Sequence, residues 1–298
     1  MTLRKTASVP LAPALRGMLW MAANGALFVV LSTILKALSH DLAPWQVGFL
    51  RYLMGLAVIL PATLRLGVHA LWPQAPKLQL VRGLFHGGGM LLWFLALPLV
   101  TVTELTAIGF SSPIFVCLGA VLFLRERMSA ARWIAVLTGF LGVTIVLRPW
   151  QAGDPGGLSP GMLLMLASAL VFAGSYLVAK MLTRHDRPEV IVLWQHVWVA
   201  LLLIPFMLPE WTAPSATQWL VFAACGFIGA GGHYCMARAF RAADLSAVQS
   251  VRFLELVWAV ILGYLVFASV PAGWTLVGGA VILGSTLWLA RHETRGAR

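Results

Sequence analysis

Apolar runs long enough to cross a lipid bilayer fill almost the whole chain. A membrane-spanning helix needs about 17–25 mostly apolar residues. Ten runs of roughly this length are present, at residues 16–37, 45–62, 79–97, 102–123, 131–148, 160–181, 189–208, 217–238, 245–267 and 273–290. Charged residues make up only 10% of the chain, far below the share that a soluble surface carries. The sequence therefore predicts an all-α integral membrane protein with ten transmembrane helices, whose surroundings are the lipid bilayer.

The basic residues are concentrated in every second connection between these runs. The net charge is +11, which in a soluble protein would point toward nucleic acid. If the N-terminus is cytoplasmic, seventeen of the 21 Lys and Arg residues fall in cytoplasmic segments, among them Arg82, whereas Lys36 and Arg148 fall in outer segments. This asymmetry is the positive-inside pattern. It predicts an inner-membrane protein with both termini in the cytoplasm, and no nucleic-acid partner.

The two halves of the chain carry the same sequence pattern. The stretch GMLWMAANGALFVVLSTILKAL at residues 17–38 matches GMLLMLASALVFAGSYLVAKML at residues 161–182 in eight of twenty-two positions, at an offset of 144. Further along, at an offset of 143, Gly83 corresponds to Gly226. Each half holds five predicted spans. Because five is odd, the second half must enter the membrane from the opposite side.

Inverted repeats of this kind are typical of secondary transporters, which bind substrate near the membrane midplane where the repeats meet. The chain is predicted to consist of two inverted-topology five-helix repeats, 16–150 and 151–291, between cytoplasmic tails 1–15 and 292–298. Such a protein moves its solute by alternating access, because the two repeats can exchange roles.

Two passages resemble a known transporter family. Residues 112–146, SPIFVCLGAVLFLRERMSAARWIAVLTGFLGVTIV, combine an early proline, an L-x-E-R stretch and two later glycines. Residues 238–267, RAFRAADLSAVQSVRFLELVWAVILGYLVF, occupy the matching place in the second half. With the 5+5 layout, these passages resemble the drug/metabolite transporter superfamily in its EamA-type branch. The resemblance implies a transporter of small organic metabolites, whose central cavity is walled by the first, third and fourth spans of each repeat. Ser269 stands where the first half has Glu126, so the acid at this turn is either dispensable or structural on one side only.

Charged residues inside the predicted spans are candidates for substrate binding, because such charges are costly in a bilayer. Arg252 and Glu255 are three positions apart and share one helix face. They are predicted to line the substrate cavity, although a mutual ion pair would also explain them. Glu104 and Glu255 are the candidates for proton coupling, and the macrodipole of a helix N-terminus would by itself account for Glu104. Arg51 corresponds to Gln195 in the second half, and a structural role is favoured there.

Uncharged polar and aromatic residues complete the predicted cavity. His86 and His233 lie in spans that wall the cavity of the resembled family, so they are candidates for ligand binding or proton handling; a hydrogen bond to a backbone carbonyl is the alternative. Asn24 and Ser168 occupy matching positions in the two halves, which favours a face toward the cavity over helix packing alone. The aromatic candidates for the cavity wall are Trp20, Trp93, Tyr176 and Trp258.

Glycines in matching places of the two halves are predicted to permit helix movement. Gly88 and Gly89 correspond to Gly231 and Gly232, and residues without side chains allow helices to bend or to approach closely. Pro113 is a further predicted kink or turn point. Tight packing is the alternative explanation for the glycines, and it is compatible with a hinge.

No motif for nucleotide, metal or covalent chemistry accompanies these features. The chain has no GxxxxGK[ST] loop and no His/Cys cluster with metal-ligand spacing, so no cofactor, metal site or catalytic residue is predicted. The prediction is a secondary transporter, not an enzyme, with amino-acid or metabolite export across the inner membrane as the leading case. The alternative is a drug, polyamine or nucleoside-type permease or exchanger, and a membrane-embedded enzyme or a channel is more remote. Substrate, direction, proton coupling and the choice between monomer and dimer stay open at this stage.

Overall fold

The structure, a computed structural model, describes residues 12–38, 41–100, 108–148, 159–267 and 270–295, and within these ranges it contains helices and no β-strand. Nine segments in this part of the chain are long and apolar enough to cross a membrane, and a tenth is a shorter apolar helix. The ten-helix membrane fold is confirmed. The elements are α1 (Pro13–Leu38), α2 (Pro44–Leu64), η1 (Val68–Leu71), α3 (Pro76–Ala96), η2 (Leu97–Leu99), α5 (Ser112–Leu124), α6 (Ala130–Leu147), α7 (Pro160–Leu182), α8 (Pro188–Met207), η4 (Leu208–Glu210), α9 (Ala216–Ala242), α10 (Leu245–Gln249), η5 (Ser250–Phe253), α11 (Leu254–Phe267) and α12 (Gly273–Arg295).

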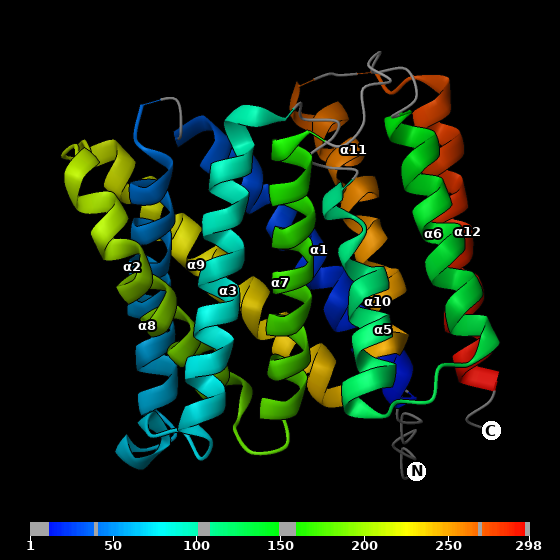
Figure 1. The fold of residues 1–298 in the computed structure, drawn as a ribbon, viewed down its shortest axis with the longest axis horizontal. Helices are drawn as coiled ribbons and strands as arrows, with labels where there is room; N and C mark the ends of the chain where they lie inside the picture. The colour runs from blue at the N-terminus through cyan, green and yellow to red at the C-terminus, as the bar shows by residue number, and fades with distance from the viewer. Residues whose placement is uncertain (1–11, 39–40, 101–107, 149–158, 268–269, 296–298) are drawn as a thin grey trace, which may run out of the picture.

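The two halves run through the bundle in opposite directions. In Figure 1, α1 rises from the lower end, whereas α7, the first helix of the second half, descends from the upper end. The start of α1 and the end of α12 both lie at the lower end, as do the α2–α3 and α5–α6 connections, which carry Arg65 and Arg127. The fold therefore has the inverted-topology repeats that the odd number of spans predicts, with basic residues gathered at one end.

Local sequence determines where most helices begin. Proline occupies one of the first two positions of α2, α3, α5, α7 and α8, where its missing N–H costs no helical hydrogen bond. The hydroxyls of Ser129, Ser159 and Ser215 accept hydrogen bonds from backbone N–H groups in the first turns of α6, α7 and α9, which satisfies donors that the helix itself leaves free.

Buried and exposed apolar residues separate by face, as expected for a bundle in lipid. Met21, Val116 and Met236 belong to a core in which α1, α5 and α9 meet, and each is at most 5% exposed. On the outside, Phe123 is 75% exposed and Leu265 is 73% exposed. Such side chains can contact acyl chains without penalty, because lipid is as apolar as they are.

Glycines at matching positions of the two repeats each pack closely against a helix of the other repeat. A Cβ atom on Gly226 in α9 would lie 2.5 Å from the carbonyl carbon of Met54 in α2. Its sequence counterpart, Gly83 in α3, packs closely against the side chain of Trp198 in α8, and Trp198 is the counterpart of Met54 at an offset of 144. These contacts bring α9 close to the backbone of α2 and α3 close to the Trp198 side chain of α8, and they determine how the helices are rotated against each other.

A matched pair of hydrogen bonds joins the first helix of each repeat to the third helix of the other. The Asn24 Nδ2 atom donates to the Gly232 carbonyl oxygen at 2.9 Å, and the Ser168 Oγ atom donates to the Gly89 carbonyl oxygen at 2.8 Å. All four residues are buried. In this conformation, the predicted cavity residues Asn24 and Ser168 therefore bond between helices.

The fourth and ninth spans are interrupted, where the sequence predicted continuous helices over 102–123 and 245–267. The fourth turns at Phe110 and Ser111 before α5, and the ninth is divided into α10, η5 and α11. Phe110 and Phe253 correspond at an offset of 143, and their ring centroids lie 6.1 Å apart. Both interruptions thus lie where the repeats meet. Pro113 is among the first residues of α5, after the turn, rather than within a bent helix.

Candidate functional site

Unpaired polar groups mark the interruption in the ninth span. Gln249 and Ser250 are both 0% exposed. Neither the two amide atoms of Gln249 nor the Ser250 hydroxyl has a hydrogen-bond partner within the described residues. Burying such a group without a partner costs about 1–3 kcal/mol. Broken helices that expose polar groups at membrane depth are the usual setting of a transporter binding site.

The predicted residues Arg252, Glu255, Tyr176 and Trp258 come together beside this interruption. The Arg252 Nε atom lies 3.7 Å from the Glu255 Oε1 atom, and the Arg252 guanidinium carbon lies 4.7 Å from the ring centroid of Tyr176. Arg252 Nη1 and Trp258 Nε1 are buried donors with no acceptor in the described part of the chain. We call Tyr176, Gln249, Ser250, Arg252, Glu255 and Trp258 the central site.

A glycine in α1 closes one side of the central site. A Cβ atom on Gly25 would lie 2.9 Å from Glu255 Cγ and 3.5 Å from Trp258 Cδ1, so a larger residue at this position would force the Glu255 side chain or α1 to shift. The site combines aromatic faces with a hydrogen-bond acceptor in Glu255 and donors in Arg252 and Trp258. The Gln249 amide can both donate and accept hydrogen bonds. Planar solutes with polar edges fit such a set, because rings stack on rings while the edges form hydrogen bonds.

His86 and His233, which the sequence could place only on separate spans, lie side by side in a second polar group. Their ring centroids are 5.5 Å apart, and that of His196 lies 5.6 Å from that of His233. The Tyr52 hydroxyl is 2.8 Å from His86 Nε2, and Arg51 Nη2 is 3.1 Å from His233 Nε2. We call these five residues the histidine cluster. In this conformation the rings of His86 and His233 bond to side chains of α2, α7 and α8, and His196 Nδ1 donates to the Val192 carbonyl oxygen.

Arg82 corrects one sequence prediction. The charge count placed it in a cytoplasmic segment, but it lies inside α3 and is 1% exposed. Its Nη1 atom donates to the Ile191 carbonyl oxygen at 2.8 Å, and Nη2 donates to Gln195 Oε1. Arg51, for which the sequence favoured a structural role, bonds to His233, and neither Arg51 nor Arg82 forms an ion pair with a carboxylate among the described residues.

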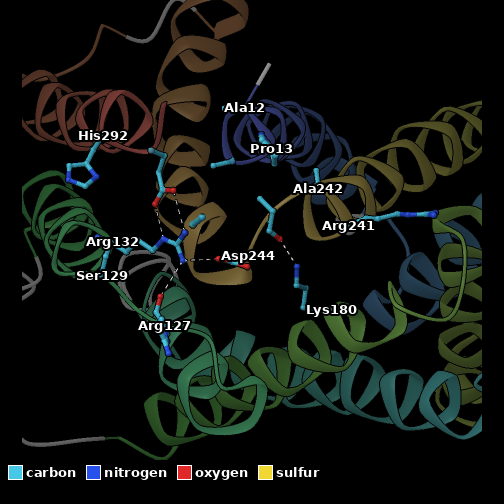
Figure 2. A pocket seen from close by; sticks show the side chains of 14 residues that line it. Ala12, Pro13, Arg127, Ser129, Arg132, Lys180, Arg241, Ala242, Asp244 and His292 are labelled. Carbon is cyan, nitrogen blue, oxygen red and sulfur yellow. Dashed lines mark hydrogen bonds and ion pairs between the residues drawn. The ribbon is translucent and has the colours of Figure 1, made fainter. Parts of the chain in front are cut away.

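Charged residues at the lower end bind the two repeats together. The Glu126 carboxylate accepts hydrogen bonds from the backbone N–H groups of Leu245 at 2.8 Å and Ser246 at 3.0 Å, at the start of α10. Arg132 pairs with Asp244 at 3.1 Å and with Glu293 at 2.8 Å, and Figure 2 shows Arg132 extended toward Asp244. We call Glu126, Arg132, Asp244 and Glu293 the charged latch.

The charged latch has no sequence counterpart at the upper end. At an offset of 143, the residues that correspond to its four members are Ser269, Thr275, Thr101 and Trp150. None of these can carry a charge. Glu126 is therefore a structural acid in the first repeat only. Of the two alternatives that the sequence left open, the structure supports this one over a dispensable acid.

Substitution of Glu126 by alanine should weaken the latch measurably. It removes a charged acceptor from α10, and hydrogen bonds to charged groups contribute about 1.5–3 kcal/mol each. We expect the melting temperature of the detergent-solubilised protein to fall by several degrees. Arg184→Gln, which alters an exposed charge at the same end, serves as the control. Equal melting temperatures for the two variants would show that the Glu126 contacts add nothing.

Both halves of the chain match one family model, that of the EamA-like transporter family, at residues 15–148 and 159–291. The chain belongs to this family. It is a multi-pass membrane transporter of small metabolites, and it is not an enzyme.

Individual relatives of this EamA-like transporter span nearly its whole length. A riboflavin transporter of Rhizobium johnstonii is 34% identical over 294 residues, which cover 95% of this chain and 93% of that protein. An S-adenosylmethionine uptake transporter of Rickettsia conorii is 29% identical and covers 88% of each chain. A solved crystal structure with 22% identity aligns with a TM-score of 0.78 over 93% of this chain and 98% of that one, which shows the same fold.

Trp20, Trp93 and Glu104 are the remaining residues predicted for the cavity or for proton coupling in this EamA-like transporter. Trp20 lies toward the lower end, where its ring centroid is 6.3 Å from that of Tyr234, and the Trp93 ring is edge-to-face with that of Phe94, with the centroids 5.3 Å apart. Glu104 lies outside the described residues, so its predicted role in proton coupling stays a prediction. Among the described residues, no group of three His, Cys, Asp or Glu side chains could hold a metal ion.

The four predicted hinge glycines of the EamA-like transporter differ in the space around them. A Cβ atom on Gly89 would meet the Phe172 ring at 3.0 Å, and one on Gly232 would meet the Phe28 ring at 2.6 Å. For Gly88 and Gly231 the nearest atoms would be 3.9 and 3.8 Å away. Both α3 and α9 continue as helices through these positions. Gly89 and Gly232 therefore serve close packing here, and their predicted role as hinges stays a prediction.

Proposed function

We propose that this transporter carries riboflavin, or a closely similar neutral planar solute, and that the central site binds it. The observation that carries the proposal is the set of unpaired donors and acceptors at Gln249, Arg252 and Trp258 beside the ring of Tyr176. A flavin has a flat ring for aromatic contacts and a polar edge for hydrogen bonds. The likeness to a riboflavin transporter over nearly the whole chain supports the same solute class.

S-adenosylmethionine is the second candidate. Glu255 favours it, because a carboxylate in the central site could pair with a cationic solute, and a relative named for its uptake is 29% identical. Arg252 lies 3.7 Å from Glu255 and offsets that charge, which favours the neutral flavin. The expectation of amino-acid export has no counterpart among the relatives described above, so amino acids, polyamines and nucleosides enter as competitors in the test.

We infer that the lower end of the bundle in Figure 1 faces the cytoplasm of a bacterial inner membrane. The connections rich in Arg and Lys lie there, and such segments stay on the cytoplasmic side. Rocking of the inverted repeats about the interrupted helices would then expose the central site to each side in turn.

Counterflow in proteoliposomes tests the substrate. With unlabelled riboflavin inside, labelled riboflavin should accumulate transiently, and excess lumiflavin, which has the ring without the ribityl chain, should compete. The same assay with S-adenosylmethionine and with amino acids ranks the alternatives. An imposed pH gradient tests the prediction that Glu104 or Glu255 couples transport to protons. Flux of S-adenosylmethionine or an amino acid without riboflavin flux would reject the flavin assignment.

A further inference from the structure

A pocket outside the central site of this transporter is lined by arginines. It has a volume of about 490 Å³ at the lower end of the bundle, and its walls include Arg16, Trp20, Arg187, Glu189, Arg238 and Arg241. We call it the arginine pocket. Its volume is within the range of small-molecule sites, about 300–1,000 Å³. It has no part in the central site described above.

The charge of the arginine pocket is not neutralised. Four guanidiniums face one carboxylate, that of Glu189, and none of the four forms an ion pair within the described part of the chain. Arg238 is held by the Tyr234 hydroxyl at 2.8 Å and lies 5.1 Å from the ring centroid of Trp20. The pocket therefore has excess positive charge next to an aromatic ring.

A neighbouring pocket, which Arg241 also lines, contains an arginine whose charge is paired. This pocket, of about 660 Å³, contains Arg132, whose charge is paired with Asp244 and Glu293. Lys180 in the same pocket donates to the carbonyl oxygens of Phe240 and Ala243. In Figure 2, Arg241 extends away from Arg132 and Asp244. The positive-inside pattern explains why arginines gather at this end, but it does not explain why four of them line one pocket with a single acid and form no ion pair among the described residues.

The walls of the arginine pocket come from both repeats. Arg16 and Trp20 belong to α1 in the first repeat, whereas Arg187, Arg238 and Arg241 belong to the second. A ligand bound between them would restrain the movement of one repeat against the other. Guanidinium groups bind phosphate through paired, charge-assisted hydrogen bonds, and a neighbouring ring can contact a planar group of the same ligand.

We propose that the arginine pocket binds the phosphate ester of a planar solute and that its occupation slows transport. The prediction that the pocket binds phosphate follows from its arginines alone. The prediction that the planar group is a flavin rests on the proposed function. A phosphorylated form of the carried solute, present on the lower side, would then inhibit further transport. A phosphate group could also come from a lipid headgroup, which offers the same oxygens to the arginines.

Binding to the full-length protein in nanodiscs of neutral lipid tests the proposal. Flavin mononucleotide should bind with an affinity that falls as salt rises, and Arg187→Gln combined with Arg241→Gln should weaken it at least tenfold. Riboflavin binding should be unchanged in this double variant. Arg65→Gln combined with Arg184→Gln removes two exposed charges from the same end and is the matched control. Equal losses in both double variants would overturn the site, because the effect would then follow net charge alone.

Further measurements distinguish a solute phosphate from a lipid phosphate in the arginine pocket. They also distinguish failure of this proposal from failure of the flavin assignment. Flavin mononucleotide on the lower side should slow riboflavin counterflow in the wild type and not in the Arg187/Arg241 variant. If riboflavin is not carried, binding of inorganic phosphate and of adenosine monophosphate that depends on the two arginines would still support the phosphate site. Displacement of flavin mononucleotide by short-chain phosphatidylglycerol, without displacement by inorganic phosphate, would assign the pocket to lipid and overturn the solute proposal.

Discussion

Replacement of Arg252 by glutamine is expected to lower solute flux at sub-saturating concentration by roughly 10- to 100-fold. Arg252 has a buried Nη1 donor with no acceptor in the described part of the chain. A hydrogen bond from a charged group contributes about 1.5–3 kcal/mol, and about 1.4 kcal/mol corresponds to a tenfold change in affinity. The measurement is initial riboflavin counterflow in proteoliposomes with equal amounts of folded protein. Arg65→Gln, at an exposed position, should transport normally.

A double variant separates substrate contact from charge balance at Arg252. Arg252→Gln leaves the Glu255 carboxylate without its ion pair, which could by itself disturb the site. Arg252→Gln combined with Glu255→Gln removes both charges. If Arg252 contacts the solute, the double variant should stay inactive. Recovery of flux in the double variant would limit Arg252 to neutralising Glu255 and would remove it from the binding residues.

Replacement of Gly226 by alanine is expected to destabilise the fold by about 3 kcal/mol, the upper part of the usual range for overpacking. The new Cβ atom would lie 2.5 Å from the carbonyl carbon of Met54 and 2.7 Å from the backbone nitrogen of Gly55. Backbone atoms cannot rotate away as a side chain can, so α2 and α9 would have to separate. Thermal stability followed by size-exclusion chromatography in detergent should show a large drop in melting temperature.

Gly231→Ala is the matched control for this helix. It lies in α9 as well, but its Cβ atom would meet only the Leu27 Cδ1 atom, at 3.8 Å. Alanine is also the better helix former by about 1 kcal/mol. This variant should therefore be as stable as the wild type or more so. Equal stability of Gly226→Ala and Gly231→Ala would contradict the close backbone approach between α2 and α9.

The repeat pattern predicted more than topology. It paired Gly83 with Gly226 from letters alone, and in the structure each packs closely against the corresponding helix of the other repeat, Gly226 against the Met54 backbone and Gly83 against the Trp198 side chain. It also paired Asn24 with Ser168, and both form the equivalent interhelical hydrogen bond. Matching positions in inverted repeats have equivalent surroundings, so a correspondence in sequence predicts a correspondence in packing. It could not predict that these two polar groups would bond to carbonyl oxygens in this conformation.

The candidate site was predicted in part. Arg252, Glu255 and Trp258 were visible as charged or aromatic residues within an apolar run, and Tyr176 was selected from another. Gln249 and Ser250 were not selected, because the run 245–267 reads as one continuous helix and gives little sign of η5. Two adjacent polar residues within that run were the available signal. Arg82 was wrongly predicted to lie in a cytoplasmic segment. Its position in the sequence does not show that Ile191 and Gln195 in α8 accept its hydrogen bonds.

The sequence by itself determined the ten spans, their alternating direction and the inverted relation of the halves. These follow from local properties: the length of apolar runs, the side on which basic residues lie, and an odd number of crossings per repeat. Only the tertiary structure decided which polar groups share a site. That choice depends on the rotation and separation of helices, which are set by contacts such as Gly226 with Met54, between residues in different repeats. Because a polar group in lipid must find its partner on a neighbouring helix, no single span reveals whether that group has one.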